Sequence, residues 1–341
     1  MTTGESAAGA GRARYGMTVP FDGVPLHEHR RWFDELAGLG YSDVWSSEVD
    51  GSDGFTPLAL AAAWTPALHL GVAIAPAFTR GPALLAQTVA AMAEAAPGRF
   101  AFGLGASSDV IVERWNGIAY DDPFKRTRDT LRFLRAALGG ERVDEAYDTF
   151  AVRGFRLSRP VDRPPPLYLA ALRPGMLRLA GREADGVILN WLSADDVPKA
   201  VAEVGPGKEV VARLFVLPNG DADVARASAR RLIASYLNVR AYAAFHRWLG
   251  RGPLLEPMWS AWSAGDRKGA LAAIPDALVD DLVIHGTPDA CRDHVARYVA
   301  NGVTLPVLHV FPVGVDLADA VRALAPQARE AREARRPTPD R

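Results

Sequence analysis

The chain has 341 residues, 49% of them hydrophobic, which is enough for one large domain or two smaller ones. Its 39 Lys and Arg residues almost balance its 40 Asp and Glu residues, which argues against a general nucleic-acid binder, since such proteins carry a basic excess. The single cysteine, Cys291, excludes an intramolecular disulfide framework and a structural zinc site built on cysteine ligands.

The two ends of the chain differ from its middle. Residues 1–12 are small and polar and lack the apolar run of a secretory signal, so we expect a disordered lead-in there. Residues 333–341 are charged and polar, and we expect a disordered tail. No stretch approaches about 18 consecutive apolar residues, so we expect no membrane span and a cytoplasmic protein.

Between the ends, short apolar runs alternate with Ala- and Leu-rich stretches of helical periodicity. The apolar runs predict strands at 14–19, 41–45, 69–75, 99–104, 166–170, 184–189, 210–216 and 304–310. The other stretches predict helices at 25–38, 57–65, 82–96, 122–138, 174–182, 194–203, 221–236, 287–301 and 317–332. Asp122 stands where a capping residue is expected for the helix 122–138. The strand runs are mostly apolar rather than alternating, which is typical of parallel strands covered on both faces.

Two stretches interrupt this alternation. Residues 141–157 predict a β-hairpin inserted before the fifth strand, and residues 237–285 predict a helical insertion between strands seven and eight. Alternating elements leave two α/β architectures, a doubly wound sheet and a (β/α)₈ TIM barrel. A dinucleotide-binding sheet would carry a Gly-rich fingerprint after an early strand, whereas the nearest approach here, residues 103–108, follows the fourth strand and ends in Ser. Eight strand candidates favour the barrel, as a single domain over residues 13–332.

The active site of such a barrel lies at the C-terminal ends of its strands. The residues there are mainly aromatic and small, which suits a flat, partly apolar ligand. Trp45 and Trp191 fit either ligand contact or ordinary packing at the barrel rim. The chain lacks HExxH, GxSxG and P-loop motifs, and its histidines do not show metal-ligand spacing, so we expect no metal. His27 and His29 are expected on different faces of a solvated helix.

Three features favour a small anionic ligand. The turn after strand five presents backbone N–H groups at a helix N-terminus with Arg173 nearby. The turn after strand four offers hydroxyls and unhindered amides, although Gly and Pro also occur in such turns for backbone reasons alone. Arg213 lies in an apolar strand, so it meets either an acid in the core or an anionic ligand.

Six segments, which together span most of residues 15–315, have a characteristic order and spacing: GLGYSDVWSSE, LGVAIAPAFTRGPALLAQ, GRFAFGLGASS, ERWNGIAYDDPFKRTRDTLRFLRAAL, AALRPGMLRLAGREADGVILNW and HGTPDACRDHVARYVANGV. In these segments the chain resembles the luciferase-like monooxygenase superfamily, and in particular its F420-dependent oxidoreductases. The resemblance implies a (β/α)₈ barrel that uses FMN or the deazaflavin coenzyme F420.

The resemblance also implies site residues. In F420-binding relatives, strand three carries a bulge with a non-prolyl cis peptide behind the deazaflavin ring, which implies an irregularity within residues 72–75 and contacts from Ala73 and Ile74. The ring or ribityl chain is implied to lie near Gly105, Ala106, Ser107 and Ser108. The cofactor's side chain and phosphate are implied to lie near Ala170, Ala171, Leu172, Arg173, Pro174, Gly175 and Asn190. Some relatives use a His after strand two, where this chain has residues 45–48; Glu48 and the nearby Asp53 are therefore the candidate proton donors.

The sequence thus predicts an oxidoreductase that transfers a hydride between coenzyme F420 and a small organic substrate. The alternatives are an FMN-dependent monooxygenase of the same barrel and a non-catalytic barrel that binds a flavin or deazaflavin. Arg80 and Arg173 at the expected pocket mouth favour F420, whose lactyl-glutamyl tail is acidic. We expect a homodimer without a nucleic-acid or membrane partner.

Overall fold

The computed structural model describes residues 14–326. The expectations for residues 1–12, for residues 333–341 and for the end of the helix 317–332 lie outside this range.

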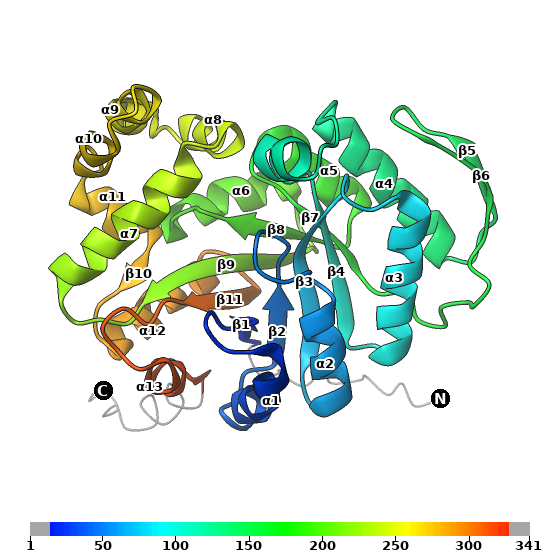
Figure 1. Cartoon of the computed structure of the whole chain (residues 1–341), viewed down its shortest axis with the longest axis horizontal. Helices are drawn as coiled ribbons and strands as arrows, with labels where there is room; N and C mark the ends of the chain where they lie inside the picture. Colours follow the sequence, from blue (N-terminus) through cyan, green and yellow to red (C-terminus); the bar gives the residue numbers. More distant parts are fainter. Residues whose placement is uncertain (1–13, 327–341) are drawn as a thin grey trace, which may run out of the picture.

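Eight parallel strands close into a barrel whose strand order is that of the chain (Figure 1). The pairing of β8 with β9 completes the ring. The strands are β1 (Gly16–Thr18), β2 (Asp43–Ser46), β3 (His69–Pro76), β4 (Phe100–Gly105), β7 (Leu167–Ala170), β8 (Gly186–Asn190), β9 (Glu209–Leu217) and β11 (Leu305–Val310). The short strand β10 (Ile284–His285) adds to β9. The predicted barrel is confirmed.

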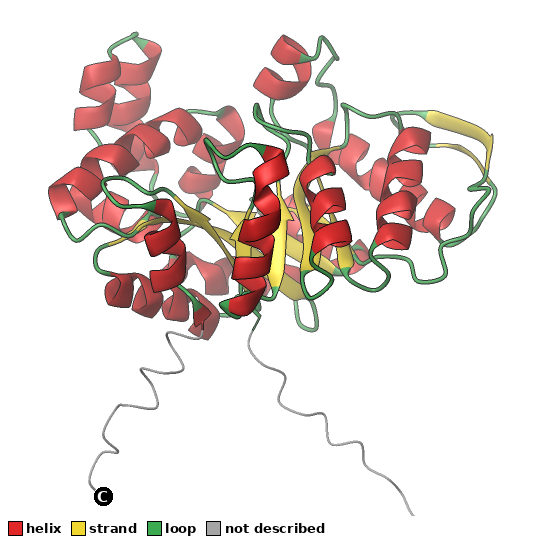
Figure 2. Ribbon diagram, turned by 60° about the horizontal axis from the view of Figure 1, so that its bottom comes forward, coloured by secondary structure: helices red, strands yellow, loops and turns green. Residues whose placement is uncertain are grey.

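Helices surround these strands (Figure 2). They are α1 (His29–Gly38), α2 (Thr56–Trp64), α3 (Pro82–Ala95), α4 (Pro123–Leu138), α5 (Pro174–Glu183), α6 (Val197–Val204), α7 (Ala222–Leu237), α12 (Pro288–Ala300) and α13 (Leu317–Ala323). Their apolar faces pack on the outward faces of the strands in one large core that includes Phe33, Leu85 and Leu134. Within residues 14–326, no helix has the length and apolarity needed to cross a bilayer.

Both predicted insertions form. The hairpin of β5 (Val143–Ala146) and β6 (Ala151–Phe155) lies outside the barrel (Figure 1). Between α7 and β10 the chain forms α8 (Arg240–Trp248), α9 (Gly252–Ser263), α10 (Arg267–Ala272) and α11 (Asp276–Leu282). These helices share a second hydrophobic core with Trp191, Phe215 and Leu217, which come from the ends of β8 and β9. The helical insertion is therefore anchored to that edge of the barrel.

The interior of the barrel is filled by side chains from alternate strand positions. Its middle consists of Trp45, Ala101, Tyr168, Ile188, Val211, Leu305 and Val307. The Trp45 ring occupies the space that Gly71 leaves on the next strand, where a Cβ would lie 2.4 Å from ring atoms. The barrel thus has a solid core rather than a channel.

A polar floor closes the N-terminal end of the barrel. Arg14 forms ion pairs with Asp43 on β2 and with Glu209 on β9, the latter at 2.6 Å between Nη1 and Oε1. The hydroxyl of Tyr168 donates a hydrogen bond to the other oxygen of Glu209. These contacts join strands that are far apart in the sequence and leave the C-terminal end as the open one.

Strand β3 is irregular in its middle, as the resemblance implies. Its register against β4 shifts between Val72 and Ala75, and the peptide bond between Ala73 and Ile74 is cis. On β4, a Cβ at Gly103 would lie only 2.2 Å from the carbonyl oxygen of Val72. The predicted departure from regular geometry is confirmed, and β4 approaches β3 at a distance that only glycine permits.

Two local expectations are wrong. Asp122 has a left-handed backbone with φ of 43°, and its side chain does not cap α4. His29 is fully buried instead of solvated. Its Nε2 accepts a hydrogen bond from the N–H of Phe21 at 2.9 Å, and its Nδ1 lies 3.1 Å from the carbonyl oxygen of Pro25. Burial lowers the pKa of His29, and the neutral ring ties the turn after β1 to α1.

Candidate active site

The C-terminal end of the barrel is open. The residues at its inward-facing positions are half-buried: Ala73, Ala170, Asn190, Arg213 and His309. One layer deeper, the inward-facing side chains of Trp45, Ile188, Val211 and Val307 are buried. Contact with solvent therefore begins within a single layer of side chains. This half-buried layer of side chains above Trp45 is the opening of the barrel.

Several buried polar atoms near this opening have no hydrogen-bond partner among the described residues. They are Thr18 Oγ1, Thr79 Oγ1, Asn190 Oδ1, Trp191 Nε1 and Arg213 Nε. Buried polar atoms are normally paired, because an unpaired one costs about 1–3 kcal/mol. These five atoms lie at or just after the strand ends, where they are available to a polar ligand.

Small residues form the wall of the opening on β3, β4 and β7. A Cβ at Gly105 would lie 3.0 Å from the side chain of Ile74 and 3.2 Å from the Cβ of Ala170. Ala73 and Ile74 are half-buried, although the strand residues on either side of them are buried. The structure thus brings together Ala73, Ile74 and Gly105, together with Ala170 of the group assigned to the cofactor's side chain, into a wall of backbone and small side chains. Such a wall leaves room for a flat ring.

The segment after β4 borders this wall. Ala106, Ser107 and Ser108 are half-buried. Ser107 has a left-handed φ of 64°, and its carbonyl oxygen accepts a hydrogen bond from the Tyr120 hydroxyl at 2.9 Å. The Ser108 hydroxyl oxygen accepts one from the N–H of Ile111 at 3.3 Å. These bonds give the turn a defined shape beside the opening.

The turn between β7 and α5 lies next to β8 along the rim. Ala171 is buried, and its N–H donates to the carbonyl oxygen of Ile188 at 3.1 Å. Leu172 and Pro174 are half-buried, and Gly175 is exposed. Arg173, at the N-cap of α5, is exposed and makes no side-chain capping bond. The first amides of α5 and the Arg173 guanidinium are therefore available to an anion.

Glu48, a candidate proton donor, has partners for both carboxylate oxygens. Oε1 accepts a hydrogen bond from the N–H of Gly54 at 3.0 Å, and Oε2 pairs with Arg80 at 2.5 Å. The N–H of Glu48 donates to the carbonyl oxygen of Ile74 at 3.3 Å. Glu48 and Arg80 thus hold the loop after β2 against β3. Arg80, expected as a basic residue at the mouth, is already paired.

Asp53 caps the helix that follows this loop. Its Oδ1 accepts hydrogen bonds from the N–H groups of Phe55 at 2.8 Å and Thr56 at 2.9 Å. Burial opposes ionisation of Asp53, but the bonds from Thr56 and Phe55 outweigh it and lower the pKa of this carboxyl. The contacts of Glu48 and Asp53 stabilise the loop after β2 and the start of α2. Their role as proton donors stays a prediction.

Polar side chains line the barrel on β8, which is next to β7, and on β9 and β11, which lie across from β3 and β4. Asn190 Nδ2 donates to the hydroxyl of Tyr242 at 3.1 Å, and Arg213 Nη2 donates to His309 Nδ1 at 2.7 Å. Burial, with a smaller effect of Arg213, holds the pKa of His309 well below its ordinary value. The sequence did not single out His309 or Tyr242. His309 is nevertheless the one polar residue of β11, which was a usable signal.

The two tryptophans at strand ends are both buried. Trp45 lies inside the barrel, below the opening. Trp191 has a left-handed φ of 53° and stacks on Phe215 with ring centroids 4.1 Å apart. Of the two possibilities that the sequence left open for this pair, packing accounts for Trp45, and Trp191 belongs to the core of the helical insertion.

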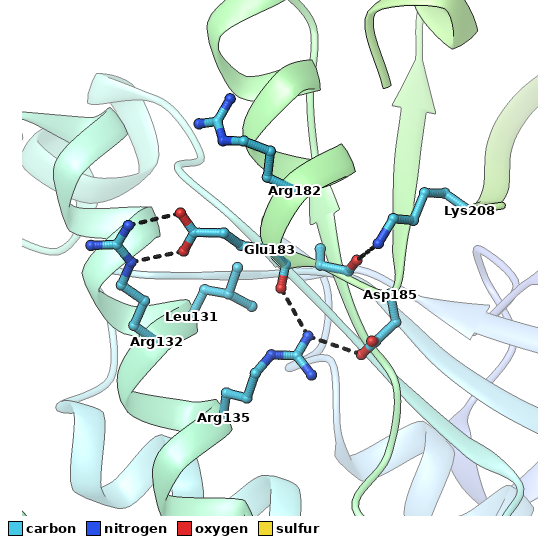
Figure 3. A pocket seen from close by; sticks show the side chains of 8 residues that line it. Leu131, Arg132, Arg135, Arg182, Glu183, Asp185 and Lys208 are labelled. Carbon is cyan, nitrogen blue, oxygen red and sulfur yellow. Dashed lines mark hydrogen bonds and ion pairs between the residues drawn. The ribbon is translucent and has the colours of Figure 1, made fainter. Parts of the chain in front are cut away.

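A separate polar cavity of about 350 Å³ lies beside the N-terminal ends of β8 and β9 (Figure 3). Glu183 accepts two hydrogen bonds of 2.7 Å from Arg132, and its carbonyl oxygen accepts one of 2.9 Å from Arg135. Lys208 donates to the carbonyl oxygen of Ala184 at 2.8 Å. Cations at a helix C-terminus are stabilising. These contacts terminate α5 and pair most of the charges that line the cavity; Arg182 points away from them (Figure 3).

Comparison with known proteins agrees with this geometry. The model of the luciferase-like monooxygenase family matches residues 3–305. A 5,10-methylenetetrahydromethanopterin reductase of Methanolobus tindarius is 26% identical over 319 residues, which cover 90% of this chain and 96% of the relative. A protein of Mycobacterium tuberculosis named as a coenzyme F420-dependent oxidoreductase is 26% identical over 348 residues, which cover 92% of this chain and 98% of the relative.

Solved structures show the same fold. The coenzyme F420-dependent tetrahydromethanopterin reductase of Methanopyrus kandleri matches with a TM-score of 0.76 and 20% identity, over 93% of this chain and 98% of that one. The oxygenating constituent of a Pseudomonas putida diketocamphane monooxygenase, in complex with FMN, matches with a TM-score of 0.62 and 16% identity, over 96% and 99%. Because the family model spans most of the sequence, the chain belongs to the luciferase-like monooxygenase family.

Proposed function

We propose that this protein is an oxidoreductase that transfers a hydride between coenzyme F420 and a small organic substrate. The observation that carries the proposal is the opening at the C-terminal end of the barrel, which has a flat wall of small residues on β3, β4 and β7 and unpartnered polar atoms around it. Relatives named for F420-dependent reactions support the choice of cofactor.

The residues present fit a deazaflavin. Ala73, Gly105 and Ala170 leave backbone accessible to a planar ring, with Ile74 at its border. The first amides of α5 and Arg173 suit the phosphate of the cofactor's side chain, because a helix N-terminus attracts anions. When bound, the cofactor supplies a hydride at carbon five of its ring.

The contribution of the chain is to bind, orient and shield the reacting groups. The buried layer beneath the opening excludes water from one side, and the helical insertion anchored on Trp191 and Phe215 borders another. Holding two reactants in a fixed orientation replaces an encounter in solution by a step within one complex. This task requires walls and a few polar contacts rather than a catalytic triad.

An FMN-dependent monooxygenase is the second candidate, favoured by the FMN complex among the structures of the same fold. Titrating the purified apoprotein with F420 and with FMN separates the two. We expect saturable binding of F420 and oxidation of F420H₂ when an acceptor is supplied. Tight FMN binding without a response to F420 would reverse the order of the two candidates.

The same experiment addresses a purely binding role. A barrel that binds a deazaflavin without using it would saturate with F420 but would not oxidise F420H₂ with any acceptor tried. Turnover with one acceptor dismisses that role.

A further inference from the structure

Arg213 is a cation without a counter-charge inside the opening. It occupies an inward-facing position of β9, between Asn190 on β8 and Val307 on β11. Its Nε is buried without a partner, and among the described residues its guanidinium forms no ion pair with a carboxylate. A desolvated charge is costly unless it is paired, so an anion that binds next to Arg213 is stabilised by this charge.

Among the described residues, the side chains that contact Arg213 carry no negative charge. Arg213 Nη2 donates to His309 Nδ1 at 2.7 Å, which requires a neutral imidazole with its proton on Nε2. The Tyr236 hydroxyl oxygen accepts a hydrogen bond from the Arg213 side chain, and Tyr242 and the exposed Asp22 act on Arg213 at longer range, so no carboxylate contacts the guanidinium. Arg213 Nε–H and His309 Nε2–H are therefore two donors on adjacent strands.

Aromatic rings surround this pair. The ring centroid of Phe215, two residues further along β9, lies 5.3 Å from the Arg213 guanidinium carbon and 5.6 Å from the His309 ring. The His309 ring is 4.4 Å from Phe311, and Phe215 is 6.0 Å from Tyr236. All these side chains except Phe215 are half-buried. The anion that Arg213 accepts is thus bordered by flat apolar surfaces.

The strand order fixes the place of this wall relative to the other. In a ring of eight strands, β9 lies four strands from β3, and β11 lies four strands from β4. Arg213 and His309 therefore face the wall of Ala73, Ile74 and Gly105 across the opening. A molecule between the two walls has a flat surface on one side and two hydrogen-bond donors on the other.

We propose that Arg213 and His309 form a subsite for an anionic oxygen of the substrate, and that the substrate is a flat, conjugated organic acid. This inference rests on the proposed function only in that the cofactor occupies the opposite wall. Arg213 binds the carboxylate, His309 donates from Nε2, and the aromatic rings cover the conjugated body. Asn190, whose Oδ1 is unpartnered, adds an acceptor at the edge of the subsite.

The phosphate or the acidic tail of the cofactor is a second anion that has the chemistry to bind at Arg213. The exposed turn at α5 suits that group better, because a long charged tail has to leave the barrel, whereas Arg213 lies inside it.

The test measures binding to the apoprotein without cofactor. Cinnamate and its neutral isostere cinnamamide are titrated calorimetrically into the wild type, into Arg213→Met and into the matched control Arg173→Met. We expect the wild type to bind cinnamate about tenfold or more tightly than cinnamamide, as a charged hydrogen bond provides. Arg213→Met is expected to lose this preference, and Arg173→Met to keep it.

Equal binding of cinnamate and cinnamamide by the wild type would overturn the proposal, as would an Arg213→Met variant that keeps the preference. If Arg213→Met does not fold, as judged by circular dichroism, His309→Gln takes its place and is expected to weaken cinnamate binding while cinnamamide binding stays the same. An unchanged preference in His309→Gln then overturns the proposal.

Parallel titrations with F420 and with inorganic phosphate separate the two sources. Weakened F420 or phosphate binding in Arg213→Met, together with competition between cinnamate and F420, would assign the anion to the cofactor and overturn the proposal. A cinnamate preference that needs Arg213 supports the subsite even if F420 fails to bind. In that case the proposed function fails and the subsite remains.

Discussion

Replacing Gly103 with Ala measures how much the close approach of β4 to β3 matters. The added Cβ would lie 2.2 Å from the carbonyl oxygen of Val72 and 2.4 Å from Cδ1 of Ile188. The end of the Ile188 side chain can turn away, but the carbonyl oxygen moves only if the backbone of β3 moves. Overpacking a core commonly costs about 1–3 kcal/mol. Because a backbone atom is in the way, we expect a loss of about 3 kcal/mol of unfolding free energy, the top of that range.

Equilibrium urea denaturation, followed by tryptophan fluorescence and by circular dichroism, measures this loss. Gly38→Ala is the matched control, because Gly38 ends α1 and has no heavy atom within 4 Å of an added Cβ. The unfolding free energy of that variant is expected to equal that of the wild type or to exceed it by up to about 1 kcal/mol, the helix-propensity difference between Gly and Ala. An unfolding midpoint for Gly103→Ala that equals the wild-type midpoint would refute the reasoning.

Three further substitutions test individual side chains. Arg173→Ala is expected to weaken binding of the cofactor's phosphate about tenfold, with an unchanged melting temperature of the apoprotein because Arg173 is exposed; an equal loss of melting temperature would assign Arg173 a structural role instead. Asp53→Ala removes the cap of α2 and is expected to cost about 1 kcal/mol in urea denaturation at neutral pH. Because the folded-state pKa of Asp53 is lowered, this cost is complete above about pH 4 and shrinks as the pH falls further; a cost that persists unchanged at pH 2 contradicts the capping role. Burial, aided by Arg251, lowers the pKa of His246 to about 4, so the unfolded chain binds the extra proton first and wild-type stability falls from about pH 6.5 towards pH 4. In His246→Leu this decrease of unfolding free energy with falling pH is expected to be smaller by on the order of 3 kcal/mol. Urea denaturation of both proteins at pH 7 and at pH 4.5 measures it, and an equal decrease in the two proteins would contradict the prediction.

The strands of the barrel were predictable because they are buried on both faces. A run such as residues 210–216 is apolar at successive positions, and the observed β9 extends it by one residue at each end. The irregular part of β3 came from the family resemblance and not from the periodicity of its residues. That resemblance located it within residues 72–75, where the register shift lies.

The partners of the polar side chains were not predictable in the same way. Arg213 and His309 are 96 residues apart in the sequence, and only closure of the barrel brings their strands together. His29 was placed on a solvated face because helical periodicity does not record its bond from the N–H of Phe21. For Asp53 a local signal did exist. An Asp shortly before Thr56 and Pro57 at a helix start indicates a cap, and hence a reason for the carboxylate other than catalysis.

The polar floor of the barrel has a kinetic consequence. The contacts of Arg14 with Asp43 and Glu209, together with the buried Trp45 above them, leave the strand C-termini as the entrance to the barrel interior. Two ligands on opposite walls of this interior enter and leave through this same end. Each one, while bound, narrows the path by which the other leaves, so the dissociation rate of one ligand is expected to fall when the other is bound.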